Sequence, residues 1–504
     1  MKSGNRGYGE AGASHAKRAL KGFVAESASA IEDIDANNYT LRQRARMLYM
    51  SAPVATSAIR TSRTNTIGIG LQLNPKIDQA VLGMDAEAAE AWQREVKVEF
   101  ALWAEDKAAC DATGMNDFYA IQQLAFVSML TSGDCFVMRK ERKPSKMRPY
   151  GLRLHVIEAD RVSSPSLAAK AGLLWTESEN PANGNKIHDG VEVDGSGMVV
   201  AYHVCNHYPY SYISAGEPDE WVRVEAYGRR TGMPNVLHLM SSERPDQYRG
   251  VSYLAQVVEP ILQMRRYTDA EVMAAVVQSF YTAFIKTETP PTDMPFNEAM
   301  PGQAGDDAER YDPTEYRMGP GQVNVMNPGE DVTALAPTHP NSGFDEFIKA
   351  MCTQVGAALE IPRDLLLKEF NASYSASRAA LLEAWKAFRM YRAWFTSDFC
   401  QPVYEWWLSE AVARGRIDAP GFFEDPKLRK AWLKAEWVGP SQGQLDPVKE
   451  ISAEMMAVEA GFTTSTDAAI RLNGSDWVAN MDQIERELAK KEGGTAAGKR
   501  GAKG

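Results

Sequence analysis

The sequence predicts an α+β protein with more than one domain, and three observations support this. Segments with apolar residues at helical spacing enclose a central segment in which short apolar runs alternate with polar residues. The chain has 504 residues, 44% of them apolar, whereas a single core usually stops growing at roughly 250 to 300 residues. Residues 287–341 are rich in Pro, Gly, Asp and Asn and separate two helical segments. We therefore expect several packed units.

Helices are expected in the first part of the chain, after an N-terminal arm. Residues 1–30 begin with a Gly- and Ser-bearing basic stretch that no apolar segment of a signal peptide follows, so we expect a mobile arm. Residues 31–63 have apolar positions at helical spacing with arginines between them. Residues 85–106 have the pattern of an amphipathic helix, and residues 118–131 should form a second helix beside it.

In the middle of the chain, the sequence pattern predicts strands first and long helices after them. A mostly antiparallel β region is expected over residues 135–238, where short alternating runs are separated by Gly, Pro and Asn. A continuous helix should follow up to Lys286, with Pro260 near its first turn, where the missing N–H costs little. Residues 344–359 are predicted to be helical and to end at Ile361-Pro362, because the residue before a proline avoids the α region.

A long helix is predicted from Ser375, with a kink at Pro402. One side of it carries large apolar residues, namely Leu381, Trp385, Phe388, Phe395 and Phe399. Such a stripe indicates packing against a large partner surface.

A small helical domain is predicted near the C-terminus. Asp446-Pro447 is typical of a helix start and Gly461 of its end, and Ser475 or Asp476 could start another helix. A tail rich in Gly and Lys follows.

Composition excludes several classes of protein. The net charge of −11 argues against a sequence-reading DNA binder, because such proteins gather basic patches on phosphates. If this acidic protein contacts DNA, we expect the DNA to move past it without strong adhesion, because both are negatively charged. Five cysteines, an odd number and far apart, indicate neither a disulfide framework nor a zinc cluster and favour a reducing compartment. The longest uncharged apolar stretch, residues 272–285, is shorter than the roughly 20 residues that span a bilayer.

Two motifs contain residue types that are typical of ligand sites. Gly493 and Gly498-Lys499 have the spacing of a phosphate-binding loop, but Arg500 stands where a Ser or Thr would hold magnesium, so nucleotide binding is not expected. His203, Cys205 and His207 alternate, and on a strand they would point to one face, where they could ligate zinc. A half-buried strand face is the simpler interpretation, because no fourth ligand is near in sequence.

No catalytic constellation is predicted. Glu383 and the pair Asp306-Asp307 lack accompanying His or Lys residues for acid–base chemistry and are interpreted as solvated faces. Ser373, Ser375 and Ser377 stand in no nucleophile motif, and capping of the long helix is their expected role. We expect neither an enzyme nor a bound cofactor or metal.

The order of several motifs resembles the lambda-type phage portal proteins over about residues 31–449. The first half contributes Leu41-Arg42-Gln43-Arg44-Ala45-Arg46, Ala52-Pro53-Val54-Ala55, Asn65 to Gly70, Gly133-Asp134 in place of the more usual Gly-Glu, Gly190 to Asp194 with Val200-Ala201-Tyr202, and Gln247 to Ser252. The second half contributes Pro328-Gly329-Glu330, Ile361-Pro362, Asn371 to Ala380 and Leu445 to Glu450. Tyr374-Ser375-Ala376-Ser377-Arg378 departs from the family's Tyr-Ser-Ser-x-Arg.

The resemblance implies a portal fold, with an α/β wing, a helical stem, a small clip insertion and a helical crown, assembled as a ring. Applied to this chain, it divides the sequence as follows: arm 1–30, wing 31–252, first stem helix 253–286, clip 287–341, second stem helix 342–359, tunnel loop 360–374, long wing helix and wing remainder 375–440, crown 441–492 and flexible tail 493–504.

The resemblance also implies a function without chemistry of its own. It predicts a ring, commonly of twelve subunits, at one capsid vertex, through which double-stranded DNA passes non-specifically during packaging and ejection. The implied partners are the terminase motor, the major capsid or scaffolding protein and the head–tail connector. No membrane is involved. The protein is expected in the virion and, during assembly, in the host cytoplasm. Four residues of the tunnel loop are expected to lie at the narrowest part of the channel, namely Lys368, Asn371, Ser373 and Tyr374.

Two alternatives to a portal were weighed. Another virion structural protein, such as a head–tail adaptor, is disfavoured because adaptors are usually much shorter. A DNA-packaging enzyme would require a carboxylate metal cluster or a competent phosphate-binding loop, and the sequence offers neither.

Overall fold

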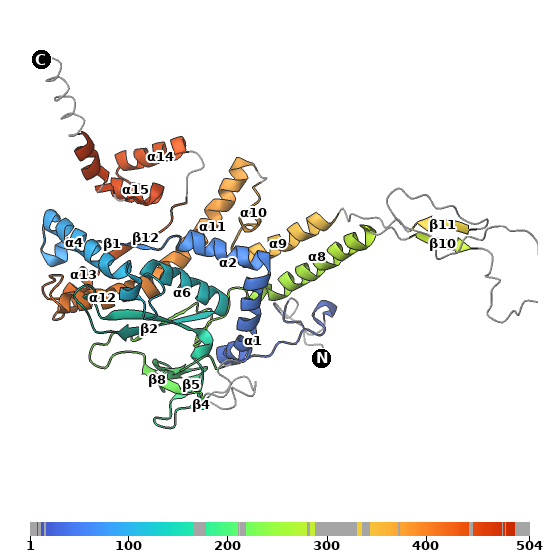
Figure 1. Cartoon of the computed structure of the whole chain (residues 1–504), viewed down its shortest axis with the longest axis horizontal. Coiled ribbons are helices and arrows are strands. Elements are labelled where there is room, and N and C mark those ends of the chain that lie inside the picture. Colours follow the sequence, from blue (N-terminus) through green and yellow to red (C-terminus); the bar gives the residue numbers. More distant parts are fainter. Residues whose placement is uncertain are drawn as a thin grey trace, which may run out of the picture. The chain divides into compact units, whose positions relative to one another are not determined.

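The computed structural model confirms the α+β class (Figure 1). It describes residues 8, 12–14, 17–165, 178–209, 211, 218–279, 283–287, 330–334, 343–370, 373–442, 447–475, 477–478 and 480–488. The chain forms two compact units. The first contains residues 1–258 and 356–504, and the second contains residues 259–355.

Four helices of the first unit account for the three segments predicted to be helical, residues 31–63, 85–106 and 118–131. Helix α1 (Ala30–Ser51) starts with a capping box between Ser29 and Glu32, and α2 (Pro53–Thr66) has its proline at the first position. Helices α4 (Ala86–Ala104) and α6 (Phe118–Ser132) start after the aspartate caps Asp85 and Asp117. Two single-turn helices, α3 (Gln79–Leu82) and α5 (Lys107–Cys110), were not predicted.

The predicted β region forms two antiparallel sheets. One has the order β3-β2-β9, with β2 (Asp134–Glu141) between β3 (Leu152–Glu158) and β9 (Val236–Met240). The other has the order β4-β5-β6-β7-β8, formed by Ser178–Glu179, Lys186–His188, Val191–Val193, Val199–Cys205 and Trp221–Glu225.

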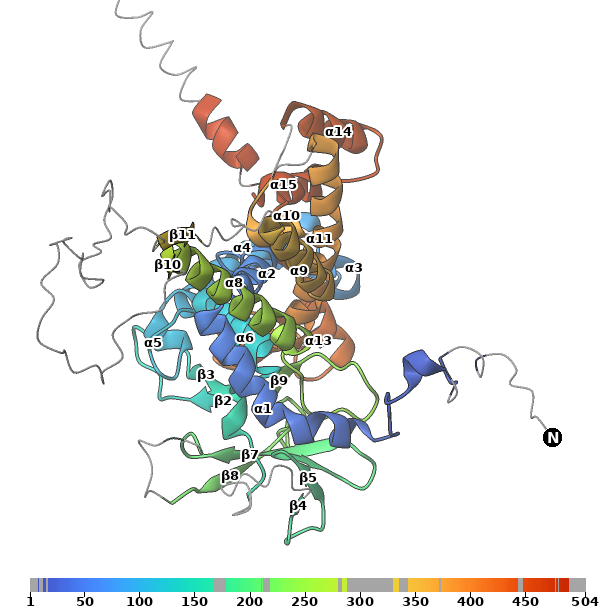
Figure 2. The ribbon, with the colours of Figure 1, turned by 90° about the vertical axis from the view of Figure 1, so that its right-hand side faces the viewer.

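The two sheets lie one above the other in Figure 2, and buried side chains from both form one hydrophobic cluster. Phe136 and Met138 of β2 belong to the same buried cluster as Val191 of β6 and Tyr202 of β7. The ring centroids of Phe136 and Tyr202 lie 5.6 Å apart. The antiparallel prediction for residues 135–238 is therefore confirmed.

A second core is aromatic and joins α4, α6 and the helices near residue 400. Phe100 of α4 lies at its centre, with ring centroids 5.6 Å from Phe118 and 5.1 Å from Trp407. Strand β12 (Ala435–Val438) pairs antiparallel with β1 (Gln72–Pro75) and adds Trp437 to this core. Helix α13 (Pro426–Trp432) precedes β12.

The long helix is interrupted near the predicted proline. Helix α11 (Tyr374–Phe395) runs into one π-helical turn (Thr396–Cys400) and continues as α12 (Gln401–Ala413). Pro402 has no N–H and its ring crowds the carbonyl four residues earlier, so a widened turn before it avoids both problems. The sequence predicted a kink at Pro402, and the structure has a π-helical turn just before this residue. The predicted stripe is also buried at Trp385, Phe388, Phe395 and Phe399.

The C-terminal part contains helix α14 (Pro447–Glu459) and helix α15 (Ser465–Asn473). Pro447 opens α14 and Gly461 follows its end with a φ of +75°, both as predicted. Residues 477–478 and 480–488 are also helical. Asp446 and Asp476 lie outside the described residues.

The second unit contains two helical segments and a hairpin-like strand pair. Helix α8 (Val258–Ser279) and helix α9 (Phe344–Ala358) flank β10 (Ala283–Thr287) and β11 (Glu330–Ala334), which pair antiparallel. The helix predicted from Glu259 to Lys286 begins as expected, because α8 starts at Val258, but the prediction is wrong at its C-terminal end. Residues 283–287 form a strand that pairs with β11, which local periodicity does not reveal.

Most of the predicted clip, residues 288–329, lies outside the described residues. Within the described ranges, no helix combines the length and the apolar composition that a membrane span requires.

Candidate functional site

The predicted channel segment, residues 360–374, lies in the first unit between α9 and α11 and contains a helical turn that was predicted as loop. Helix α10 (Arg363–Leu367) starts directly after Pro362. A proline fixes φ near the helical value and needs no hydrogen-bond acceptor, so it suits the start of a short helix. Glu360, two residues earlier, has a φ of +54°, which turns the chain sharply after α9.

Three hydrogen bonds fix the base of this segment. The Ser57 hydroxyl of α2 donates to the Leu366 carbonyl at 2.6 Å. The Tyr253 hydroxyl donates to the Leu359 carbonyl, and the Tyr391 hydroxyl of α11 lies 3.4 Å from the Glu360 carboxylate. Burial and the nearby Glu360 carboxylate raise the pKa of Tyr391 to about 12, so its hydroxyl stays a donor at neutral pH. These hydrogen bonds therefore hold residues 359–366 in place, directly before the exposed residues 368–370.

Lys368 directly follows helix α10. Its φ of +58° and ψ of +35° place it in the left-handed region, and its N–H donates to the Asp364 carbonyl to close α10. The side chain is exposed, and within the described ranges it forms no ion pair. Phe370, two residues later, is also exposed, at 60%. The residues after α10 therefore expose the Lys368 ammonium, which is unpaired among the described residues, and the Phe370 ring.

The other predicted channel residues lie at the start of α11. Ser373 is exposed and caps the helix, with its hydroxyl accepting from the Ala376 N–H at 3.4 Å, which is the capping role that the sequence suggested for this serine cluster. Tyr374 is the first residue of α11, and Asn371 lies outside the described residues. A place in a channel stays a prediction for all four residues.

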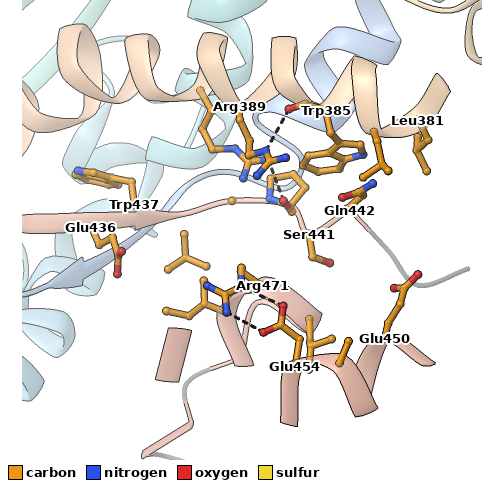
Figure 3. A pocket seen from close by; sticks show the side chains of 18 of the residues that line it. Leu381, Trp385, Arg389, Glu436, Trp437, Ser441, Gln442, Glu450, Glu454 and Arg471 are labelled. Atoms are coloured by element: carbon orange, nitrogen blue, oxygen red, sulfur yellow. Dashed lines mark hydrogen bonds and ion pairs between the residues drawn. The ribbon is translucent and has the colours of Figure 1, made fainter. Parts of the chain in front are cut away.

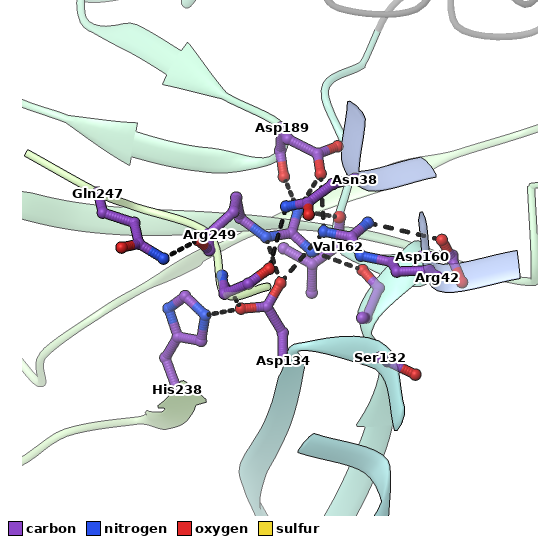
Figure 4. Close-up of polar contacts among 12 residues, drawn as sticks. Asn38, Arg42, Ser132, Asp134, Asp160, Val162, Asp189, His238, Gln247 and Arg249 are labelled. Carbon is purple, nitrogen blue, oxygen red and sulfur yellow. Dashed lines mark hydrogen bonds and ion pairs between the residues drawn. The ribbon is translucent and has the colours of Figure 1, made fainter. Parts of the chain in front are cut away.

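Figure 4 shows a cluster of charged residues that the sequence did not predict as a unit. We define the charge cluster as Arg42, Asp134, Asp160, Asp189, His238 and Arg249. Its members come from α1, β2, the turn after β3, the turn before β6, β9 and the segment that leads to α8. Segments far apart in sequence therefore meet at this point.

Asp134 is fully buried and accepts four hydrogen bonds. Arg249 Nε lies 2.8 Å away, Arg42 Nη2 3.1 Å, His238 Nε2 2.9 Å and the Gly250 N–H 2.6 Å. Burial alone would raise the pKa of this carboxyl, but the Arg249 guanidinium and the His238 hydrogen bond outweigh burial and hold it well below its usual range. Burial lowers the pKa of His238, so a neutral imidazole donates to Asp134.

Arg249 connects Asp134 to the backbone around it. Its guanidinium donates to the carbonyl of Val162 at 2.9 Å, to the carbonyl of Ala159 at 3.0 Å and to the Asp189 carbonyl, and it pairs with the Asp189 carboxylate at 2.6 Å. The planar fork of an arginine suits such multiple recognition. This residue therefore fixes the backbone of the turn after β3 and of the turn before β6.

Two glycines bring their backbones into contact beside Asp134. Gly133 ends α6 with a φ of +87°, and Gly250 lies against it. A Cβ on Gly250 would lie 2.1 Å from the Gly133 carbonyl oxygen, which no side chain can occupy. The motifs Gly133-Asp134 and Gln247 to Ser252, which are far apart in the sequence, are thus in direct contact in the fold.

Asp35 of α1, which lies near the charge cluster, predicts a pH dependence. Burial and the negative charge of Asp189 raise the pKa of Asp35 to about 7. The folded protein then holds a proton that the unfolded chain loses above about pH 4, so stability falls as pH rises from about 4 to 7. Asp35→Asn is expected to unfold at higher urea than the wild type at pH 8, and this gain should shrink at pH 5.

The expected gain follows from linkage, at about 1.4 kcal/mol per unit of pKa shift. Urea unfolding at the two pH values measures it. Glu87→Gln, at an exposed position of α4, is the matched control and should not change the pH profile. A gain of equal size at pH 5 and pH 8 would contradict the raised pKa.

The alternating His203, Cys205 and His207 do not form one cluster. Strand β7 ends at Cys205, and His203 lies 2.9 Å from the buried Glu192 carboxylate. His207 instead has Asp219 3.2 Å from its Nε2 and Cys205 Sγ 3.8 Å from its Nδ1. Cys205, His207 and Asp219 each offer one metal-ligand atom within 4.8 Å of the others, and the hydrogen bonds between these groups already account for their proximity.

The remaining sequence candidates have ordinary surroundings or are not described. Glu383 pairs with Lys386 at 2.5 Å on the exposed side of α11, as expected of a solvated face. Residues 306–307 and 493–500 lie outside the described residues.

Comparison with known proteins gives the family. A family model described as phage portal protein, lambda family, matches residues 16–392. Portal protein B of Escherichia phage lambda is 24% identical over 465 residues, 89% of this chain and 83% of the lambda protein. The portal protein of Escherichia phage N15 is 23% identical over 489 residues, 93% of this chain and 87% of its own.

Among solved structures, the neck of the native GTA particle computed with C12 symmetry aligns with a TM-score of 0.45 at 14% identity and covers 87% of this chain and 94% of its own. The family model alone covers well over half of the sequence, including both glycine motifs of the charge cluster and the whole segment from α9 into α11. This chain therefore belongs to the lambda family of phage portal proteins.

Proposed function

We propose that copies of this chain, twelve in number, form a ring at one capsid vertex and that double-stranded DNA enters and leaves the capsid through its channel. Membership of the lambda portal family is the observation that carries this proposal. In this assignment α8 and α9 are the stem helices, residues 360–374 form the tunnel loop, and α14 with α15 belongs to the crown. The charge cluster lies within the wing, and Arg249 belongs to the segment that precedes the stem in the sequence.

The ring acts without chemistry of its own in this proposal. A terminase supplies the energy, and the capsid or scaffolding protein and the head–tail connector bind the outside of the ring. Each subunit carries a net charge of −11, and DNA carries one negative charge per roughly 1.7 Å. Repulsion between the two then opposes adhesion of the DNA as it moves.

Lys368 is expected to touch DNA phosphates transiently at the channel's narrowest point. Its exposed ammonium, which forms no ion pair with any described residue, and the hydrogen bond that fixes the neighbouring Leu366 carbonyl support this role. Lys368→Glu is expected to reduce the DNA packaged per procapsid several-fold, because it places a carboxylate next to the phosphates. The measurement is nuclease-protected DNA in a packaging reaction with purified terminase and procapsids.

Two matched variants make this test specific. Lys368→Asn removes the charge with a residue that tolerates the left-handed conformation, and its loss should be smaller than that of the glutamate variant. Lys427→Glu reverses a charge at an exposed position of α13 and should package normally. Normal packaging by Lys368→Glu rings would remove this residue from the channel.

The experiment that tests the ring itself is electron microscopy of the purified chain with parallel mass determination and an ATPase assay. End-on rings of about twelve copies that do not hydrolyse ATP are the expected result. A monomer or dimer with nucleotide hydrolysis would contradict the proposal.

A further inference from the structure

Helix α14 pairs two of its glutamates with other helices of the subunit, while several of its large apolar side chains are exposed. Glu450 pairs with Arg378 of α11 at 3.0 Å, and Glu454 pairs with Arg471 of α15 at 2.7 Å. Figure 3 shows Glu454 and Arg471 facing each other beside a cavity of about 380 Å³ that α11 and the segment after β12 also line. A helix that packs only within its own subunit normally has the opposite arrangement.

The exposed side of α14 is an apolar stripe, which we define as Val448, Ile451 and Met455. These positions differ by three and seven residues and therefore lie on one face of the helix. Val448 is 76% exposed and Met455 is 59% exposed, and α14 has no buried residue. An apolar face with this exposure on a structured helix is typical of an interaction surface.

A second apolar stripe follows in the same C-terminal region. We define it as Trp477, Met481, Ile484 and Leu488, all of which are exposed. Their spacing of four, three and four residues is that of the seam between packed helices. Neither stripe is covered by other described residues. Because both are apolar and helical, they could bury each other's side chains by packing together.

A cover for these stripes needs apolar side chains of its own. Residues 489–504 contain no Val, Ile, Leu, Met or aromatic residue, so their composition does not match such a cover. A second copy of the chain, in contrast, carries both stripes. In a closed ring each subunit contacts the next through two different surfaces, one on either side, because ring interfaces are heterologous.

We infer that the α14 stripe of one copy packs against the 477–488 stripe of the next copy and so joins neighbouring subunits at the crown. This inference rests on the proposed ring and adds the surface that holds it at this end. Helix packing of apolar seams supplies the affinity, and the ion pairs of Glu450 and Glu454 hold α14 in position to present its stripe.

Cysteine crosslinking of the full-length chain tests the pairing. All five native cysteines are buried, so exposed cysteines introduced by Met455→Cys and Ile484→Cys are the reactive ones. Under mild oxidation the double variant is expected to give a ladder of disulfide-linked multimers in denaturing gels. Each single variant should stay largely monomeric, and co-expression of the two single variants should stop at dimers.

The outcomes separate this inference from the proposed ring. Rings in the microscope without intermolecular disulfides, or with a disulfide inside one chain, would overturn the crown pairing and leave the ring standing. The variant Ile451→Glu with Met455→Glu gives a second test, because both positions are exposed and the subunit should still fold. It is expected to dissociate at several-fold higher protein concentration than the wild type in mass photometry. An unchanged dissociation, with a defect only in capsid assembly, would assign the stripe to another protein and overturn the inference.

Discussion

Replacing Arg249 by methionine is expected to lower the free energy of unfolding by about 3–5 kcal/mol, the usual cost of removing one partner from a buried ion pair. Arg249 is fully buried and donates to Asp134 and to three backbone carbonyls. The variant would leave those carbonyls and part of the Asp134 charge without donors in a dry environment. Urea unfolding of the purified chain, monitored by tryptophan fluorescence, measures the loss.

Two comparisons make the Arg249 result interpretable. Arg249→Lys keeps the charge but loses the planar fork, so it should fall between the wild type and the methionine variant. Arg229→Met removes an exposed arginine that pairs with Glu225 and should leave the unfolding midpoint unchanged. Equal midpoints for Arg249→Met and the wild type would show that the charge cluster does not stabilise the fold.

Adding a single methyl group at Gly250 is expected to destabilise the protein at least as strongly, or to prevent folding. The Cβ of alanine would lie 2.1 Å from the Gly133 carbonyl oxygen, and both neighbours are backbone that cannot rotate away. Separation of the two backbones would also stretch the 2.6 Å hydrogen bond from the Gly250 N–H to Asp134. The measurement is the yield of soluble protein and its thermal midpoint.

Gly195→Ala is the matched control for this methyl group. Gly195 has open space around its Cβ position and an ordinary φ, so the substitution should leave yield and midpoint unchanged. A Gly250→Ala variant as stable as Gly195→Ala would contradict the close approach of the two backbones.

The sequence predicted helices well where caps and periodicity act locally. The 85–106 pattern corresponds to Ala86–Ala104 because Asp85 caps the helix, and the irregularity at Pro402 follows from one missing N–H. The strand Ala283–Thr287 was missed because its stabilising partner lies at Glu330–Ala334, beyond the reach of local periodicity. Pairing over such a separation depends on tertiary structure.

The charge cluster was beyond sequence reasoning for a related cause. Arg42 and Arg44 look alike in the sequence, yet Arg42 lies on the buried face of α1 with Ala45, while Arg44 is exposed. Arg42 and Arg249 reach Asp134 across 92 and 115 residues of chain. The motifs that contain these residues could be recognised one by one, but their meeting point required the fold.

The most direct test of the central claim is a cryo-EM reconstruction of the assembled ring that locates residues 360–374 relative to the axis. We expect Lys368 and Ser373 to lie closer to the axis than α8 and α9, at the narrowest part of the channel. A ring in which these residues lie farther from the axis than both helices would contradict the channel assignment.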